Sequence, residues 1–208
     1  MTLDEAIAAS PVVAIIRGVT PDEAVATAQA IHDGGIRAIE VPLNSPEPLE
    51  SIRRIVEAFD GRMAIGAGTV LSPDKVDAVR DVGGTFIVCP NTDVSVIRRT
   101  VELGLTPAPG FATPTEALMA VDAGARHLKL FPAVSFGPAH VKQIKAILPP
   151  EVDVWAVGGV GPASMAEWWA AGARGFGLGS EVYKTGQTPE ETLRKSRAAF
   201  DAAAALPR

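Results

Sequence analysis

Residues 12–41 read VVAIIRGVTPDEAVATAQAIHDGGIRAIEV, and this stretch decides the fold because it has the pattern of a strand, a helix and a second strand. It opens with a short run rich in Val and Ile, which is typical of a parallel strand buried on both faces. The Thr-Pro-Asp-Glu tetrapeptide at 20–23 predicts a helix start, because Thr can cap the helix, Pro fits its first turn and Glu can bond back to the Thr backbone. A Gly-Gly pair at 34–35 predicts the helix end, and a second apolar run follows it.

The same unit recurs along the chain. Thr-Pro-x-Glu tetrapeptides at 113–116 and 188–191 predict two more helix starts. The expected strands are residues 12–16, 36–41, 64–66, 86–88, 105–107, 127–131, 154–157 and 175–178. Eight such units without a linker predict an α/β fold, a minimal (β/α)8 TIM barrel that occupies residues 1–208 as a single domain. Residues 2–9 are expected to form a short N-terminal helix that plugs the bottom of the barrel.

The main alternative is an open, doubly wound sheet with a dinucleotide site. A Gly-x-Gly at 66–68 is too weak a signal for such a site, and the first strand is followed by Arg17-Gly18 rather than by a glycine-rich fingerprint. The barrel is therefore the favoured fold.

Composition narrows the classes of function. The net charge is −5 and both signs are mixed along the chain, so no basic stripe is available for nucleic acid. No apolar run reaches membrane-spanning length, and residues 1–10 lack the basic region of a signal peptide. The single cysteine, Cys89, excludes an internal disulfide framework. A cytoplasmic location with neither nucleic-acid nor membrane partners is expected.

Lys129 differs from the other five lysines because it lies within an apolar strand run, at 127–132. Alternation along the strand sends Leu128 and Leu130 toward the helices. It sends Lys129 into the barrel, on the same side as His127 and Phe131. Desolvation of an ammonium is costly, so burial favours the neutral amine, which can act as a nucleophile. The alternative is a structural lysine paired with a buried carboxylate.

Glu40 is the one carboxylate that a strand is expected to carry to the catalytic face, since Asp153 begins its strand at the opposite end. A carboxylate beside an amine nucleophile suits proton transfer. The alternative for Glu40 is a salt bridge to Lys129 or Arg17.

Other candidates follow strands at the same end, where the active sites of these barrels lie. Arg17 could grip a carboxylate or phosphate, or form a structural pair with Glu40. Thr69 could hold a carboxylate through its hydroxyl. Phe131 could stack on a keto-acid plane, although core packing is an alternative. Pro90 follows the fourth strand and completes this group of substrate-binding candidates.

Two glycine corners follow the last two strands, at Gly158-Gly159 and at Gly179-Ser180. In many barrels this corner binds phosphate through backbone N–H groups. The three histidines share no metal-ligand spacing, and no metal or other cofactor is expected.

Taken in order, these residues resemble the 2-keto-3-deoxy-6-phosphogluconate aldolase family. The motifs are Ile-Glu-Val-Pro-Leu at 39–43, Gly-Ala-Gly-Thr-Val at 66–70, Leu-Lys-Leu-Phe-Pro at 128–132 and the two glycine corners. The resemblance implies a class I aldolase, commonly trimeric, that needs no metal and releases pyruvate from a phosphorylated 2-keto sugar acid. It implies that Lys129 forms the Schiff base, Glu40 is the general acid and base, and Thr69 and Arg17 hold the substrate carboxylate. It places the phosphate on Gly158, Gly159, Gly179 and Ser180.

One departure favours a branch of the family. After Glu40 the gluconate-specific members typically have Leu-Arg-Thr, whereas this chain has Leu43-Asn44-Ser45-Pro46. That run, with Arg17-Gly18 after the first strand, resembles the 2-dehydro-3-deoxy-6-phosphogalactonate branch. The alternatives are gluconate or 4-hydroxy-2-oxoglutarate aldolase activity, a phosphosugar epimerase, and a phosphosugar-binding barrel without catalysis.

Overall fold

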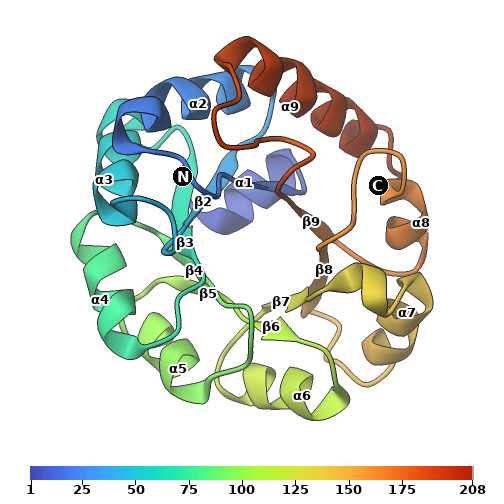
Figure 1. The fold of residues 1–208 in the computed structure, drawn as a ribbon. Coiled ribbons are helices and arrows are strands. Elements are labelled where there is room, and N and C mark those ends of the chain that lie inside the picture. The colour runs from blue at the N-terminus through green and yellow to red at the C-terminus, as the bar shows by residue number, and fades with distance from the viewer. Residues whose placement is uncertain (208) are drawn as a thin grey trace.

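The computed structural model describes residues 1–207 and arranges parallel strands as a ring with helices around it (Figure 1). The strands are β1 Val12–Ile15, β2 Ala38–Pro42, β3 Ala64–Gly68, β4 Phe86–Val88, β5 Thr106–Ala108, β6 Gly110–Phe111, β7 His127–Leu130, β8 Asp153–Val157 and β9 Gly175–Leu178. The helices are α1 Leu3–Ala9, α2 Pro21–Asp33, α3 Pro48–Phe59, α4 Pro73–Asp81, α5 Val94–Glu102, α6 Pro114–Asp122, α7 Pro138–Lys145, α8 Met165–Ala170 and α9 Pro189–Ala204, with a 3₁₀ turn η1 at Ala133–Ser135. Each barrel strand is followed by a helix, which confirms the (β/α)8 fold.

The fifth strand of the barrel is divided into two pieces. β5 pairs only with β4 and β6 pairs only with β7, and Pro109 lies between the two pieces. Proline has no N–H to donate, so it interrupts a strand ladder. The backbone carbonyl of Pro109 still accepts a hydrogen bond from the N–H of Lys129 at 2.8 Å. The pieces therefore join β4 to β7 and close the ring, whereas the sequence predicted only residues 105–107.

The short helix α1 closes one end of the barrel, as expected, and lies across the middle of the ring in Figure 1. Its side chains Leu3 and Ala6 have no exposed surface and pack with the side chains inside the barrel. Oδ1 of Asp4 lies 2.7 Å from Nε2 of His127, whose ring packs on Trp155 with centroids 4.9 Å apart. His127 thus belongs to the floor of the barrel.

Helix capping agrees with the sequence at two of the three tetrapeptides. The carboxylates of Glu23 and Glu116 accept hydrogen bonds from the backbone N–H of the Thr that precedes each helix. At the third, Thr188 accepts from the N–H of Glu191, but the Glu191 carboxylate binds Arg194 instead of returning to the cap. An arginine three residues further along the helix competes for the same carboxylate.

Two apolar layers fill the molecule, one inside the ring and one between the strands and the helices. Leu128 and Leu130 belong to the outer layer, and Lys129 points the other way, as strand alternation predicted. No helix described within residues 1–207 has the length and apolar character needed to cross a membrane.

Candidate active site

A cavity of about 520 Å³ opens at the ends of β1, β7, β8 and β9, where the chain leaves the barrel. It brings together seven of the ten residues predicted for the site. They are Arg17, Lys129, Phe131, Gly158, Gly159, Gly179 and Ser180. These residues are far apart in the sequence, and the parallel strands bring them to one end of the ring.

Lys129 lies within β7, in register with Gly110 on one side and Trp155 on the other. Its side chain is 6% exposed, and Nζ lies 4.8 Å from the centre of the Phe131 ring. Over residues 1–207 the lysine forms no salt bridge within 4.0 Å, so the geometry of a structural ion pair is not present. An amine that lines a cavity and has no paired carboxylate is free to meet an electrophile.

Glu40 is buried more deeply than expected. It lies two residues before the end of β2, because the strand continues to Pro42, and its side chain is 2% exposed. With Lys129 it lines a small hollow of about 10 Å³ inside the ring, next to the main cavity. Burial raises the pKa of Glu40, and the positive charges of Lys129 and Arg17 offset part of this rise. A raised pKa keeps more of a carboxyl group protonated at a given pH, which favours its use as a proton donor.

Glycine at position 68 leaves room for the Glu40 carboxylate. A Cβ atom on Gly68 would lie 2.7 Å from Oε1 of Glu40. We expect Gly68→Ala to displace the carboxylate and lower kcat about 10- to 100-fold, the loss typical of misplacing a reacting group by up to an ångström. The melting temperature should fall as well, because Glu40 is buried and the hollow of about 10 Å³ beside it leaves the carboxylate little room to move. Steady-state kinetics and thermal unfolding measure the two effects.

The control for Gly68→Ala is the same change in a Glu40→Gln background. If the loss arises through Glu40, adding Gly68→Ala to that background costs little further activity. An equal loss in both backgrounds would show that the effect does not pass through Glu40.

Arg17 is exposed at the mouth of the cavity, and its Nη1 donates a hydrogen bond to Oδ1 of Asn44 at 2.6 Å. The described residues contain no ion pair within 4.0 Å between Arg17 and Glu40, although the positive charge of Arg17 lowers the pKa of Glu40. The positive charge of the Arg17 guanidinium is therefore not offset by a paired carboxylate among the described residues, and it remains available to an anion at the mouth of the cavity.

The glycine corner after β8 has a backbone that suits glycine. Gly158 and Gly159 have φ of +92° and +76°, and a Cβ atom on Gly159 would lie 2.5 Å from Cβ of Val134. Any side chain at Gly159 would therefore be strained and would also meet the turn η1. The corner after β9, Gly179 and Ser180, faces the same cavity.

Two of the predicted substrate-binding residues, Thr69 and Pro90, do not line this cavity. Both follow strands at the same end of the barrel, after β3 and β4, and both are half-buried. Thr69 has φ of +57°, which is unusual for a residue with a branched side chain.

Cys89 precedes Pro90, and burial raises the pKa of its thiol to about 12, so it remains protonated and is not poised as a nucleophile.

The sequence did not identify the residues that the β9–α9 loop adds to the cavity: Glu181, Tyr183, Lys184 and Thr185. The loop lies against the β1–α2 connection, where a Cβ atom on Gly18 would lie 2.3 Å from Oγ1 of Thr185. The position of this loop after the last strand, β9, was the signal that could have indicated these four residues, because loops at this end of a barrel form the site.

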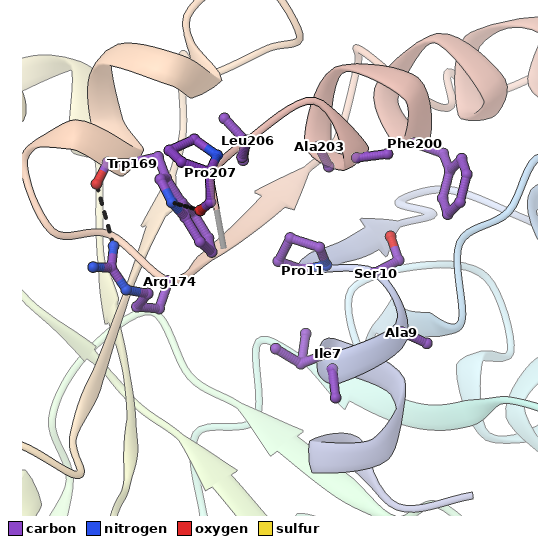
Figure 2. A pocket seen from close by; sticks show the side chains of 12 residues that line it. Ile7, Ala9, Ser10, Pro11, Trp169, Arg174, Phe200, Ala203, Leu206 and Pro207 are labelled. Atoms are coloured by element: carbon purple, nitrogen blue, oxygen red, sulfur yellow. Dashed lines mark hydrogen bonds between the residues drawn. The ribbon is translucent and has the colours of Figure 1, made fainter.

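A second cavity, of about 300 Å³, lies at the opposite end, beside α1 and the last turns of α9 (Figure 2). Pro11 and Arg174, which precede β1 and β9, line it together with Trp169. The indole N–H of Trp169 donates to the carbonyl of Pro207 at 2.8 Å, and the Arg174 guanidinium packs 4.7 Å from the indole. No lysine or carboxylate side chain among the described residues lines this cavity, so it lacks the groups that Schiff-base chemistry requires.

Comparison with known proteins points to one family. The family model for KDPG and KHG aldolase matches residues 3–196. The chain is 50% identical over 188 residues to the 2-dehydro-3-deoxy-6-phosphogalactonate aldolase of Escherichia coli K12, covering 90% of this chain and 92% of that protein. It is 32% identical to the KHG/KDPG aldolase of the same organism, covering 77% of this chain and 75% of the other.

Solved structures give the same result. The native KDPGal structure superposes with a TM-score of 0.91 at 49% identity, covering 92% of this chain and 93% of that one. The 2-keto-3-deoxy-6-phosphogluconate aldolase of Zymomonas mobilis ZM4 superposes with a TM-score of 0.86 at 25% identity, covering 98% of both chains.

Proposed function

Because this chain belongs to the KDPG and KHG aldolase family, we propose that it cleaves 2-dehydro-3-deoxy-6-phosphogalactonate to pyruvate and D-glyceraldehyde 3-phosphate. The protein is a carbon–carbon lyase, as its aldolase relatives are. The choice of substrate rests on sequence identity, which is 50% to the 2-dehydro-3-deoxy-6-phosphogalactonate aldolase and 32% to the KHG/KDPG aldolase.

The reaction begins at Lys129. Its neutral amine attacks the C2 ketone of the sugar acid to give a carbinolamine, which loses water to give an iminium ion. Glu40 supplies the proton that leaves with that water and removes the proton from the C4 hydroxyl as the C3–C4 bond breaks. The iminium nitrogen accepts the electron pair of that bond, and glyceraldehyde 3-phosphate leaves. The pyruvate enamine is then protonated at C3, and water releases pyruvate from Lys129.

The two anionic ends of the substrate take different parts of the site. The carboxylate adjoins the reacting C2 carbon, so it lies beside Lys129, where Arg17 at the mouth is the nearby guanidinium. In our proposal the carboxylate end of the substrate is also contacted by Thr69, Pro90 and Phe131. The phosphate binds the glycine corners after β8 and β9, where backbone N–H groups can approach its oxygens. The proposed steps use only groups of the chain and water.

We also propose that the protein is a cytoplasmic homotrimer. Exposed apolar side chains in the turn η1 and directly after it, at Val134 and Phe136, support a subunit contact. The free, buried Cys89 fits a reducing compartment.

The preferred substrate is tested by comparing turnover of the two C4 epimers, the phosphogalactonate and phosphogluconate keto acids. We expect a higher kcat/KM for the galactonate epimer, measured as pyruvate release. A preference for the gluconate epimer would assign the chain to the other branch of the family. Binding of both epimers without release of pyruvate would support the non-catalytic alternative.

A further inference from the structure

The Asn-Ser-Pro run after β2 is hydrogen-bonded to the β1–α2 connection, whose Arg17 lines the cavity. Asn44 accepts the 2.6 Å hydrogen bond from Nη1 of Arg17. The neighbouring Ser45, which is 8% exposed, accepts a hydrogen bond from the N–H of Gly18 at 2.9 Å through its Oγ. On the other side, the hydroxyl of Thr185 lies 3.4 Å from the carbonyl of Arg17. The run therefore holds both the backbone and the side chain of the β1–α2 connection.

We propose that Asn44 is a positioning residue that holds the Arg17 guanidinium toward the cavity while leaving its charge free for the substrate carboxylate. The inference rests on the proposed function and deepens it, because it assigns the Asn-Ser-Pro run a part in substrate recognition.

The first support is the freedom of the arginine side chain. Arg17 is exposed, and no carboxylate within residues 1–207 holds it in an ion pair. A free arginine side chain samples many rotamers, and a substrate would have to restrict them on binding. The bond to Asn44 fixes one nitrogen of the guanidinium before the substrate arrives and leaves other N–H groups available.

The second support is the chemistry of the partner. An amide oxygen accepts the same hydrogen bond as a carboxylate but adds no negative charge. An aspartate at this position would form an ion pair with Arg17, and the substrate carboxylate would have to compete with it. The neutral side chain thus orients the guanidinium without cancelling the attraction that binds the substrate.

The test compares Asn44→Asp with Asn44→Ala, using pyruvate, which carries the same carboxylate, as the probe. The measured quantity is the pyruvate concentration that gives half-maximal borohydride trapping on Lys129. We expect Asn44→Ala to raise it about 3- to 10-fold through lost ordering, and Asn44→Asp to raise it about 10- to 100-fold through lost charge. Inhibition by inorganic phosphate, which probes the other end of the site, should be unchanged.

Two controls separate this role from a structural one. Gln143→Glu places the same charge change on the exposed face of α7 and should leave pyruvate trapping unaltered. In an Arg17→Gln background, Asn44→Asp should cause little further loss, because its effect passes through Arg17. Retention of wild-type trapping by Asn44→Asp, or an equal loss with and without Arg17, would overturn the inference alone. The absence of any pyruvate adduct in the wild type would overturn the proposed function, and this inference with it.

Discussion

Replacing Lys129 by alanine is expected to lower aldol cleavage by about 10⁴- to 10⁶-fold, the loss typical of removing a covalent nucleophile. Alanine cannot form the iminium ion that accepts the electrons of the C3–C4 bond. The fold should persist, since the change removes a polar atom from the interior of a barrel held by strand pairing and two apolar layers. Pyruvate release and circular dichroism measure the two properties.

Borohydride reduction in the presence of pyruvate identifies the nucleophile directly. Intact mass should show one pyruvate adduct on the wild type, and peptide mapping should place it on Lys129. The adduct should be absent from Lys129→Ala and present on a matched control, Lys142→Ala, which removes an exposed lysine from α7. Near-normal turnover by Lys129→Ala, or an adduct on another lysine, would exclude Lys129 as the nucleophile.

Glu40→Gln is expected to lower kcat about 10²- to 10⁴-fold, which is the usual contribution of a general acid and base. The amide has the shape of the carboxyl group but cannot transfer protons in the same way. Some pyruvate adduct should still form on Lys129, because the amine remains. An unchanged kcat would remove Glu40 from the mechanism.

The same variant should change the dependence of stability on pH. Burial raises the pKa of Glu40 in the folded state above 4.5, its ordinary value. The contribution of Glu40 to the free energy of unfolding is therefore largest below pH 4.5. It is lost as the pH rises from 4.5 through the raised pKa. Glutamine does not titrate, so the free energy of unfolding of Glu40→Gln should increasingly exceed that of the wild type from pH 4.5 upward. The gain is about 1.4 kcal/mol for each pH unit by which burial displaces the pKa, and urea unfolding between pH 4 and 8 measures it.

A constant difference across that pH range would show that the Glu40 carboxyl group titrates normally in the folded protein. Such a result would also weaken the assignment of Glu40 as the proton donor.

Periodicity and capping chemistry were sufficient to predict most of the fold. The eight units, the plugging helix and the inward direction of Lys129 each follow from patterns that act over a few residues. The division of the fifth strand at Pro109 was not predicted, because the residues 110–111 gain strand geometry only by pairing with β7. The third capping box failed for a similar reason, since Arg194 competes for the capping glutamate.

The site was partly predictable because strand ends are visible in a sequence. Lys129 and the glycine corners stand out against apolar strands, and the structure brings them to one cavity. Loop residues such as Lys184 are harder to identify, because the position of the loop after the last strand assigns the loop to the site but does not show which of its side chains reach the cavity. The depth of Glu40 was also hidden, because strand alternation gives the side on which a residue lies but not its height in the barrel.

β7 joins the two ends of the molecule in one short segment. His127 contacts the plugging helix, and Lys129 follows two residues later, about 7 Å further along the strand. The same short strand therefore holds the plugging helix and carries the reactive lysine. A substitution in β7 can disturb both, so its residues are poor targets for directed evolution. The loop after β9 bears no part of the barrel floor, and its cavity-lining residues carry none of the glycine constraints of the corner after β8. It is the segment to randomise when a new aldehyde acceptor is sought, while β7, α1 and the glycine corners stay constant.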